Sequence, residues 1–107
     1  MIAQTPEPPY YAVIFSSERT AVDEGYNDTS ARMIELAAQQ PGFLGVESAR
    51  NEIGLTISYW KDLESIKNWK QNSEHTLARN SGREKWYSTF RVRICKVERE
   101  YGFEKKE

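Results

Sequence analysis

The order of strand-like and helix-like segments constrains the fold of this 107-residue chain more than any other feature. Alternating apolar residues indicate strands, and apolar residues spaced three or four apart indicate helices. The predicted strands are residues 10–17, 43–50, 55–60 and 86–101, and the predicted helices are residues 29–40 and 63–82. This order predicts an α+β fold of the ferredoxin-like β-α-β-β-α-β type, with a four-stranded antiparallel sheet and both helices on one face.

The ends of both predicted helices carry recognisable signals. Asp28 or Thr29 is suited to cap the first helix, and the sequence QPG at 40–42 ends it. Asp62 is suited to cap the second helix, and Gly82 ends it. We expect a bend near residues 72–73 in the second helix.

The last predicted strand, residues 86–101, is too long for a small sheet and has no polar face. Phe90 and Val92 point to one side, while Cys95 and Val97 point to the other. We interpret Cys95 as a packing residue. Both faces of the sheet therefore need cover. The sequence predicts a homodimer in which two sheets pack face to face, closing an α+β barrel.

Composition excludes several classes of protein. The hydrophobic fraction is 38%, the mean hydropathy is −0.76 and the aromatic fraction is 12%, which predicts a small core of large side chains. A net charge of −1 gives no electrostatic footprint for nucleic acid. One cysteine excludes an intrachain disulfide and Cys-rich zinc sites, and no segment is apolar enough to span a membrane.

A targeting sequence is not recognisable, so we expect a cytoplasmic protein. We expect an extended leader at residues 1–9, one domain at residues 10–103 and a charged tail at residues 104–107. The residues predict no metal site and no contact with a membrane or nucleic acid.

Three stretches resemble the antibiotic biosynthesis monooxygenase superfamily of dimeric α+β barrels. They are QPGFLGVESAR, SYWKDLESIKNWKQNSEH and GREKWYSTFRVRICKVEREYGF, and the resemblance covers residues 10–103. The sequence PGFLG and the pair Trp60 and Trp69 are its most specific parts. The resemblance implies a homodimer with a cavity in each subunit between the sheet and the helices. The superfamily includes cofactor-independent oxygenases of polycyclic phenols, heme-degrading monooxygenases and proteins without an established reaction.

The resemblance to the heme-degrading branch fails at the iron ligand. That branch implies an axial histidine where this chain has Arg79, and His75 lies one turn earlier, about 5.4 Å along a helix. The asparagine that the branch carries on its first strand is replaced here by Ser16 or Ser17. Heme degradation is therefore disfavoured.

A cofactor-independent oxygenase needs fewer specific residues than a heme-degrading enzyme. An electron-rich phenol, once deprotonated, can itself reduce dioxygen, so the protein needs to bind it, stabilise the phenolate and exclude water. His75 is the candidate base, because an imidazole titrates near neutral pH. The candidate pocket residues are Trp60, Trp69, Trp86 and Tyr87 as aromatic walls, with Arg79 or Arg91 to balance the phenolate charge.

Other interpretations of these residues stay open. A tryptophan on an apolar helix face commonly belongs to the core, and the only histidine of the chain can be a solvated helix residue. The sequence contains no phosphate-binding glycine loop, no cluster of metal ligands and no nucleophile elbow. We predict a monooxygenase of a small aromatic or quinone-type compound that uses no metal or flavin. The alternative is a non-catalytic dimeric protein of the same fold that binds small molecules or is associated with stress.

Overall fold

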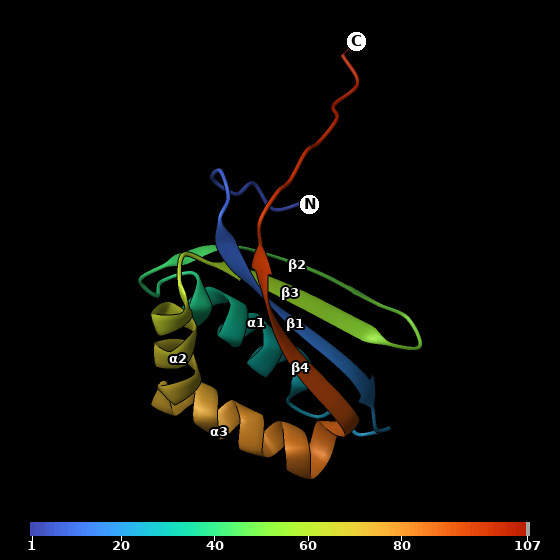
Figure 1. Cartoon of the computed structure of the whole chain (residues 1–107). Helices are drawn as coiled ribbons and strands as arrows, with labels where there is room; N and C mark the ends of the chain where they lie inside the picture. The colour runs from blue at the N-terminus through green and yellow to red at the C-terminus, as the bar shows by residue number, and fades with distance from the viewer. Residues whose placement is uncertain (107) are drawn as a thin grey trace.

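A computed structural model describes residues 1–106 and shows a four-stranded antiparallel sheet with its helices on one face (Figure 1). The strand order is β2-β3-β1-β4. The elements are β1 (Tyr10–Arg19), α1 (Tyr26–Ala37), β2 (Phe43–Arg50), β3 (Gly54–Trp60), α2 (Leu63–Gln71), α3 (Ser73–Ser81), a π-helical turn (Gly82–Trp86) and β4 (Tyr87–Val97). The predicted α+β class and ferredoxin-like order of elements are confirmed.

The first helix begins and ends earlier than its sequence signals predict. Gly25 occupies the N-cap with a φ of 79°, and no side chain accepts a capping hydrogen bond there. The prediction that Asp28 or Thr29 caps the helix is therefore wrong. Asp28 lies in the first turn, where its negative charge faces the positive end of the helix dipole. The helix ends at Ala37, before the predicted Gln40.

The second predicted helix is broken into α2 and α3. Asp62 caps α2 as predicted, because its Oδ1 accepts a hydrogen bond of 2.8 Å from the backbone N–H of Ser65. Asn72 has a non-helical ψ of 128°, and its Oδ1 accepts a hydrogen bond of 3.0 Å from the backbone N–H of His75. The expected bend is confirmed, and its cause is this second cap.

The last strand is shorter than predicted at both ends. Trp86 belongs to the π-helical turn, and β4 ends at Val97, which pairs with Tyr10 at the start of β1. Pro8 and Pro9 precede Tyr10 and have no backbone N–H to extend the pairing. Residues 98–106 consequently leave the body of the molecule as an extended segment (Figure 1).

The helix-covered face of the sheet is packed tightly only where β3 and α2 meet. Ala37, Trp60 and Ile66 form the buried cluster there, with Tyr11, Val13, Phe43 and Trp69 packed against it. The register places Val92 opposite Phe15 and Ile94 opposite Val13, so both belong to the same sheet face. They are nevertheless 48% and 54% exposed. The helices thus leave the β4 side of this face open.

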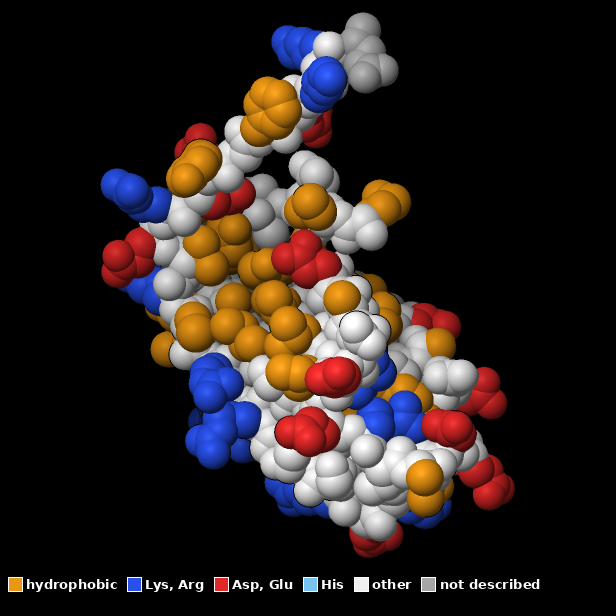
Figure 2. Space-filling view, turned by 90° about the vertical axis from the view of Figure 1, so that its right-hand side faces the viewer, with side chains coloured by type: hydrophobic (Ala, Val, Ile, Leu, Met, Phe, Trp, Pro, Cys, Tyr) orange, Lys and Arg blue, Asp and Glu red, His pale blue; other side chains and the backbone are white. Residues whose placement is uncertain are grey.

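The opposite sheet face has no helix over it. Leu55 lies opposite Ser16 and Ile57 opposite Ile14, and Figure 2 shows apolar side chains gathered in a patch on this side of the molecule. Cys95, opposite Ala12, is exposed on this face. The prediction that it packs is therefore wrong for the single chain, because nothing covers it.

The chain exposes more surface than a compact monomer of its size. Its accessible surface is 8048 Å². A folded monomer of 12.4 kDa is expected to expose about 6,100 Å². The radius of gyration is 14.6 Å; about 13 Å is expected for a compact domain of this length. The excess reflects the open sheet face, the open β4 side and the extended ends.

Candidate functional site

The break at Asn72 brings His75 of α3 back against Trp69 of α2. The two rings stack with centroids 4.1 Å apart and planes 11° from parallel. Trp60 lies beyond Trp69, with ring centroids 6.2 Å apart and planes 26° from parallel. His75 is partly buried and does not lie on the solvated side of its helix. The structure therefore assembles three of the predicted site residues into one stack.

The hydrogen bond of His75 determines which ring nitrogen is free. Its Nδ1 lies 2.8 Å from the backbone carbonyl oxygen of Trp69. A carbonyl only accepts, so Nδ1 carries the proton and, in the neutral ring, Nε2 carries the lone pair. Burial lowers the pKa of His75, the bond to Trp69 raises it, and the nearby Arg79 lowers it, with a net lowering. The ring is thus neutral at pH 7 and able to accept a proton at Nε2.

Arg79 joins α3 to the end of α2. Its Nη2 donates to the backbone carbonyl of Lys70 at 3.2 Å and to Oγ1 of Thr76 at 3.4 Å. Its Nε is buried and makes no hydrogen bond with the described part of the chain. This is the position at which the heme-degrading resemblance implies an axial histidine. Here the guanidinium holds the helix junction and places a positive charge near His75.

Trp60 is a core residue. Its side chain is fully buried, and its Nε1 donates to Oγ of Ser58 at 2.9 Å. Its ring also meets Phe43 edge to face, with centroids 5.4 Å apart. Trp60 therefore supports Trp69 from behind and has no exposed ring face for a ligand.

Trp86 and Tyr87 lie in a second aromatic cluster, separate from the His75 stack. Tyr26 meets both rings edge to face, with centroids 5.7 Å from Trp86 and 6.0 Å from Tyr87. The indole N–H of Trp86 donates to the backbone carbonyl of Glu24 at 3.0 Å. A Cβ on Gly82 would lie 2.9 Å from carbons of the Tyr87 ring, so a larger residue there requires this ring to shift.

The structure separates Arg91 from the other predicted site residues. Arg91 lies opposite Ser16, on the sheet face away from the helices, and it is exposed. It cannot balance a charge between the sheet and the helices, and the prediction for Arg91 is wrong in the single chain. The reason is strand parity, because Ser16 alternates with Val13 and Phe15, which face the helices.

Two arginines on the helix side of the sheet, Arg50 and Arg19, were not predicted from the sequence. Nη2 of Arg50 donates to Oγ of the buried Ser17 at 2.6 Å. The guanidinium carbon of Arg19 lies 3.4 Å from the ring centroid of Tyr26. Burial raises the pKa of Tyr87, and the charges of Arg50 and Arg19 partly offset this. Strand alternation counted from Val13 would have placed Ser17 on this face.

No helix within residues 1–106 is long and apolar enough to cross a membrane. The same residues bring together no group of three His, Cys, Asp or Glu side chains that could hold a metal ion.

Comparison with known proteins places the chain in a family. Residues 9–81 match the family model for antibiotic biosynthesis monooxygenase. The uncharacterized protein YqjZ of Bacillus subtilis (strain 168) is 50% identical over 105 residues, which are 96% of this chain and 92% of YqjZ.

Solved structures share the fold at low sequence identity. SnoaB, a cofactor-independent oxygenase from Streptomyces nogalater, matches with a TM-score of 0.74 and 14% identity over 87% of this chain and 97% of SnoaB. Rv0793 from Mycobacterium tuberculosis matches with a TM-score of 0.76 and 10% identity over 87% of this chain and 99% of Rv0793. These similarities show the architecture alone.

Proposed function

The chain belongs to the antibiotic biosynthesis monooxygenase family, and we propose that it is a cofactor-independent monooxygenase of a small aromatic or quinone-type compound. The observation that carries the proposal is the stack of His75 on Trp69, with Nδ1 bonded to a carbonyl and Nε2 free to act as a base. The likeness in fold to SnoaB, a cofactor-independent oxygenase, supports it.

In the proposed reaction, His75 Nε2 accepts a proton from an activated phenol or anthrone C–H or O–H group. The resulting anion transfers electrons to dioxygen, and a carbon–oxygen bond forms to give a peroxide anion. The protonated His75 returns its proton to that anion. The hydroperoxide then loses water as its carbon becomes a carbonyl, so one oxygen atom enters the quinone product and the other leaves in water.

The surrounding residues have distinct roles in this proposal. Trp69 holds the His75 ring in place by stacking, and because its two ring faces lie against His75 and Trp60, a planar substrate would meet its edge. Arg79 contributes positive charge near the substrate anion and keeps α3 fixed against α2. Tyr87, near Arg50, forms the far aromatic wall of the same helix-covered face, and Trp86 is buried against Tyr26.

We also propose a homodimer formed through the sheet face without helices. The apolar patch of Figure 2 would be buried there, together with Leu55 and Cys95. Basic and acidic side chains both border this patch (Figure 2), so a two-fold pairing can bring unlike charges together. The free, exposed thiol of Cys95 also suits a reducing compartment such as the cytoplasm. Light scattering at micromolar concentration tests the dimer, and a single monomer-sized species contradicts it.

Oxygen consumption with a panel of hydroquinones and anthrones tests the activity. We expect uptake by the wild type and a loss of about 10²-fold or more in kcat for His75→Gln, because general-base catalysis contributes typically that much. Lys67→Gln, on the exposed side of α2, is the matched control and should leave uptake unchanged. Binding of these compounds without any uptake would instead identify a non-catalytic binding protein of the same fold.

A further inference from the structure

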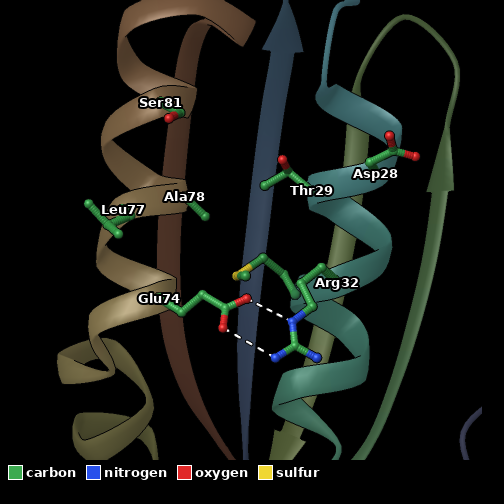
Figure 3. Close-up of a pocket in the computed structure, with 8 residues that line it drawn as sticks. Asp28, Thr29, Arg32, Glu74, Leu77, Ala78 and Ser81 are labelled. Carbon is green, nitrogen blue, oxygen red and sulfur yellow. Dashed lines mark hydrogen bonds and ion pairs between the residues drawn. The ribbon is translucent and has the colours of Figure 1, made fainter.

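A groove lies between α1 and α3, and no residue of the two aromatic clusters lines it. Its volume is about 320 Å³, near the lower end for small-molecule sites. Each helix contributes four lining residues: Asp28, Thr29, Arg32 and Met33 from α1, and Glu74, Leu77, Ala78 and Ser81 from α3. Figure 3 shows the two helices side by side with β1 running behind the space between them.

One ion pair bridges this groove. Arg32 Nε lies 2.7 Å from Oε2 of Glu74, and Nη2 lies 3.2 Å from Oε1, so the contact is bidentate (Figure 3). Among the described side chains of α1 and of residues 74–81, no other hydrogen bond or ion pair joins the two helices. Of the other lining residues, Asp28 is acidic, Thr29 and Ser81 carry hydroxyls, and Met33, Leu77 and Ala78 are apolar. The closure of the groove therefore depends on two side chains.

This ion pair is suited to open without unfolding the protein. The Arg32 and Glu74 side chains are 45% and 44% exposed, and exposed pairs contribute little to stability because water and salt screen them. Arg32 also has a second partner, Glu35, whose Oε1 lies 3.0 Å from its Nη1. The guanidinium thus keeps one carboxylate when Glu74 moves away.

The groove also holds an apolar surface that a ligand could cover. Leu77, which precedes Ala78 and lies one helical turn before Ser81, is 68% exposed, and Met33 lines the groove from α1. An aromatic ring passing between the helices would contact these side chains. An anionic group on that ring would meet Arg32, whose planar guanidinium binds carboxylates and similar anions through two hydrogen bonds.

We propose that the α1–α3 groove is the route by which an anionic aromatic ligand enters, and that Arg32 exchanges Glu74 for the anionic group of the ligand. The proposal rests on the proposed function, since it adds an entry route, bordered by Glu74 next to His75 in α3, and a substrate charge to that function. Glu74 competes with the ligand and excludes uncharged rings, while Arg32 selects for negative charge.

Binding kinetics test this proposal without any turnover. The probes are anthraquinone-2-carboxylate and the uncharged anthraquinone-2-carboxamide, and stopped-flow quenching of tryptophan fluorescence reports their entry. For Glu74→Gln we expect association of the carboxylate to be about three- to tenfold faster. For Arg32→Gln we expect the carboxylate to lose its preference over the carboxamide. Glu35→Gln removes the other carboxylate from Arg32 without opening the groove, and it should stay within twofold of the wild type.

Three results would overturn the proposal. They are unchanged association in Glu74→Gln, a preserved carboxylate preference in Arg32→Gln, and no quenching in either the wild type or Glu74→Gln. Circular dichroism of each variant confirms that it is folded. The two proposals fail separately, because faster entry in Glu74→Gln without oxygen consumption supports the route and removes only the monooxygenase.

Discussion

The two halves of the helix-covered sheet face differ sharply in packing. In the closed half, where β3 meets α2, Trp60 and Ile66 are buried against Ala37. In the open half, between β4 and α3, Val92 and Ile94 remain about half exposed although they belong to the same face. One sheet face thus has a buried core on its β3 side and solvent-exposed apolar side chains on its β4 side.

This difference suggests that the closed half stabilises the fold and the open half binds the ligand. Buried apolar area stabilises the closed half, and each large side chain there contributes several kcal/mol. The open half keeps apolar side chains in water, an arrangement that a bound ring system can improve. His75 lies where the halves meet, stacked on Trp69, which packs against the closed half.

The largest predicted effect is in the closed half. Trp60→Ala should lower the free energy of unfolding by about 3–5 kcal/mol, because it leaves a large cavity in a fully buried position. Val92→Ala in the open half should cost less than about 1 kcal/mol. Urea unfolding followed by fluorescence and circular dichroism measures both. Similar losses in the two variants would remove the distinction between the halves.

Two glycines give the next comparison. Gly42 has a φ of 86°, and a Cβ there would collide with Oγ of Ser65 in α2, so Gly42→Ala should cost about 2–3 kcal/mol. Gly82 has an ordinary helical φ of −59° and touches only the Tyr87 ring. Gly82→Ala should cost less than about 1 kcal/mol, since the ring can shift and alanine favours the helix. Thermal unfolding measures the loss of stability in each variant, and an equal loss would show that the positive φ of Gly42 does not matter.

The pH dependence of stability tests whether His75 is buried against Trp69. Burial lowers the pKa of His75 in the folded chain, so below about pH 6.5 the unfolded chain takes up a proton that the folded chain resists. Stability should therefore fall as the pH drops from 7 toward 5.5, and His75→Gln should flatten this dependence. His75 is the only histidine, which isolates its effect in this window. An equal slope in the variant would show that His75 is not desolvated.

The smallest effect is expected at the Arg32–Glu74 pair. Glu74→Gln should lower the free energy of unfolding by less than about 1 kcal/mol, because both side chains are exposed. Added salt should reduce this difference further. Urea unfolding at low and high ionic strength measures it. A loss of several kcal/mol would mean that the pair holds α1 and α3 together and does not open readily.

Local sequence signals predict the fold better than the site. Strand alternation and the Asp62 cap are encoded by neighbouring residues, so the order of elements and the break near Asn72 follow from them. The early start of α1 depends on the left-handed φ of Gly25, which residue type alone does not require. The end of β4 at Val97 depends on prolines nearly ninety residues earlier in the chain, at the start of its partner strand.

Site residues that lie close together in the sequence could be predicted, and those brought together by long-range pairing could not. His75 and Trp69 are six residues apart, and their stacking follows from the helix break between them. Predicting the positions of Arg91 and Arg50 requires the strand register, because the register decides the sheet face on which each side chain lies. The Arg32–Glu74 pair joins residues 42 positions apart in separate helices, and no local pattern marks it.

Nuclear magnetic resonance can locate a planar ligand in the open half of the sheet face. Anthraquinone-2-carboxylate is titrated into isotope-labelled protein while backbone and methyl resonances are followed. We predict shifts at His75, Met33, Val92 and Ile94, with Leu55 and Ile57 on the opposite sheet face unchanged. Shifts confined to Leu55 and Ile57, with His75 and Met33 unchanged, would show that the ligand binds the sheet face without helices instead.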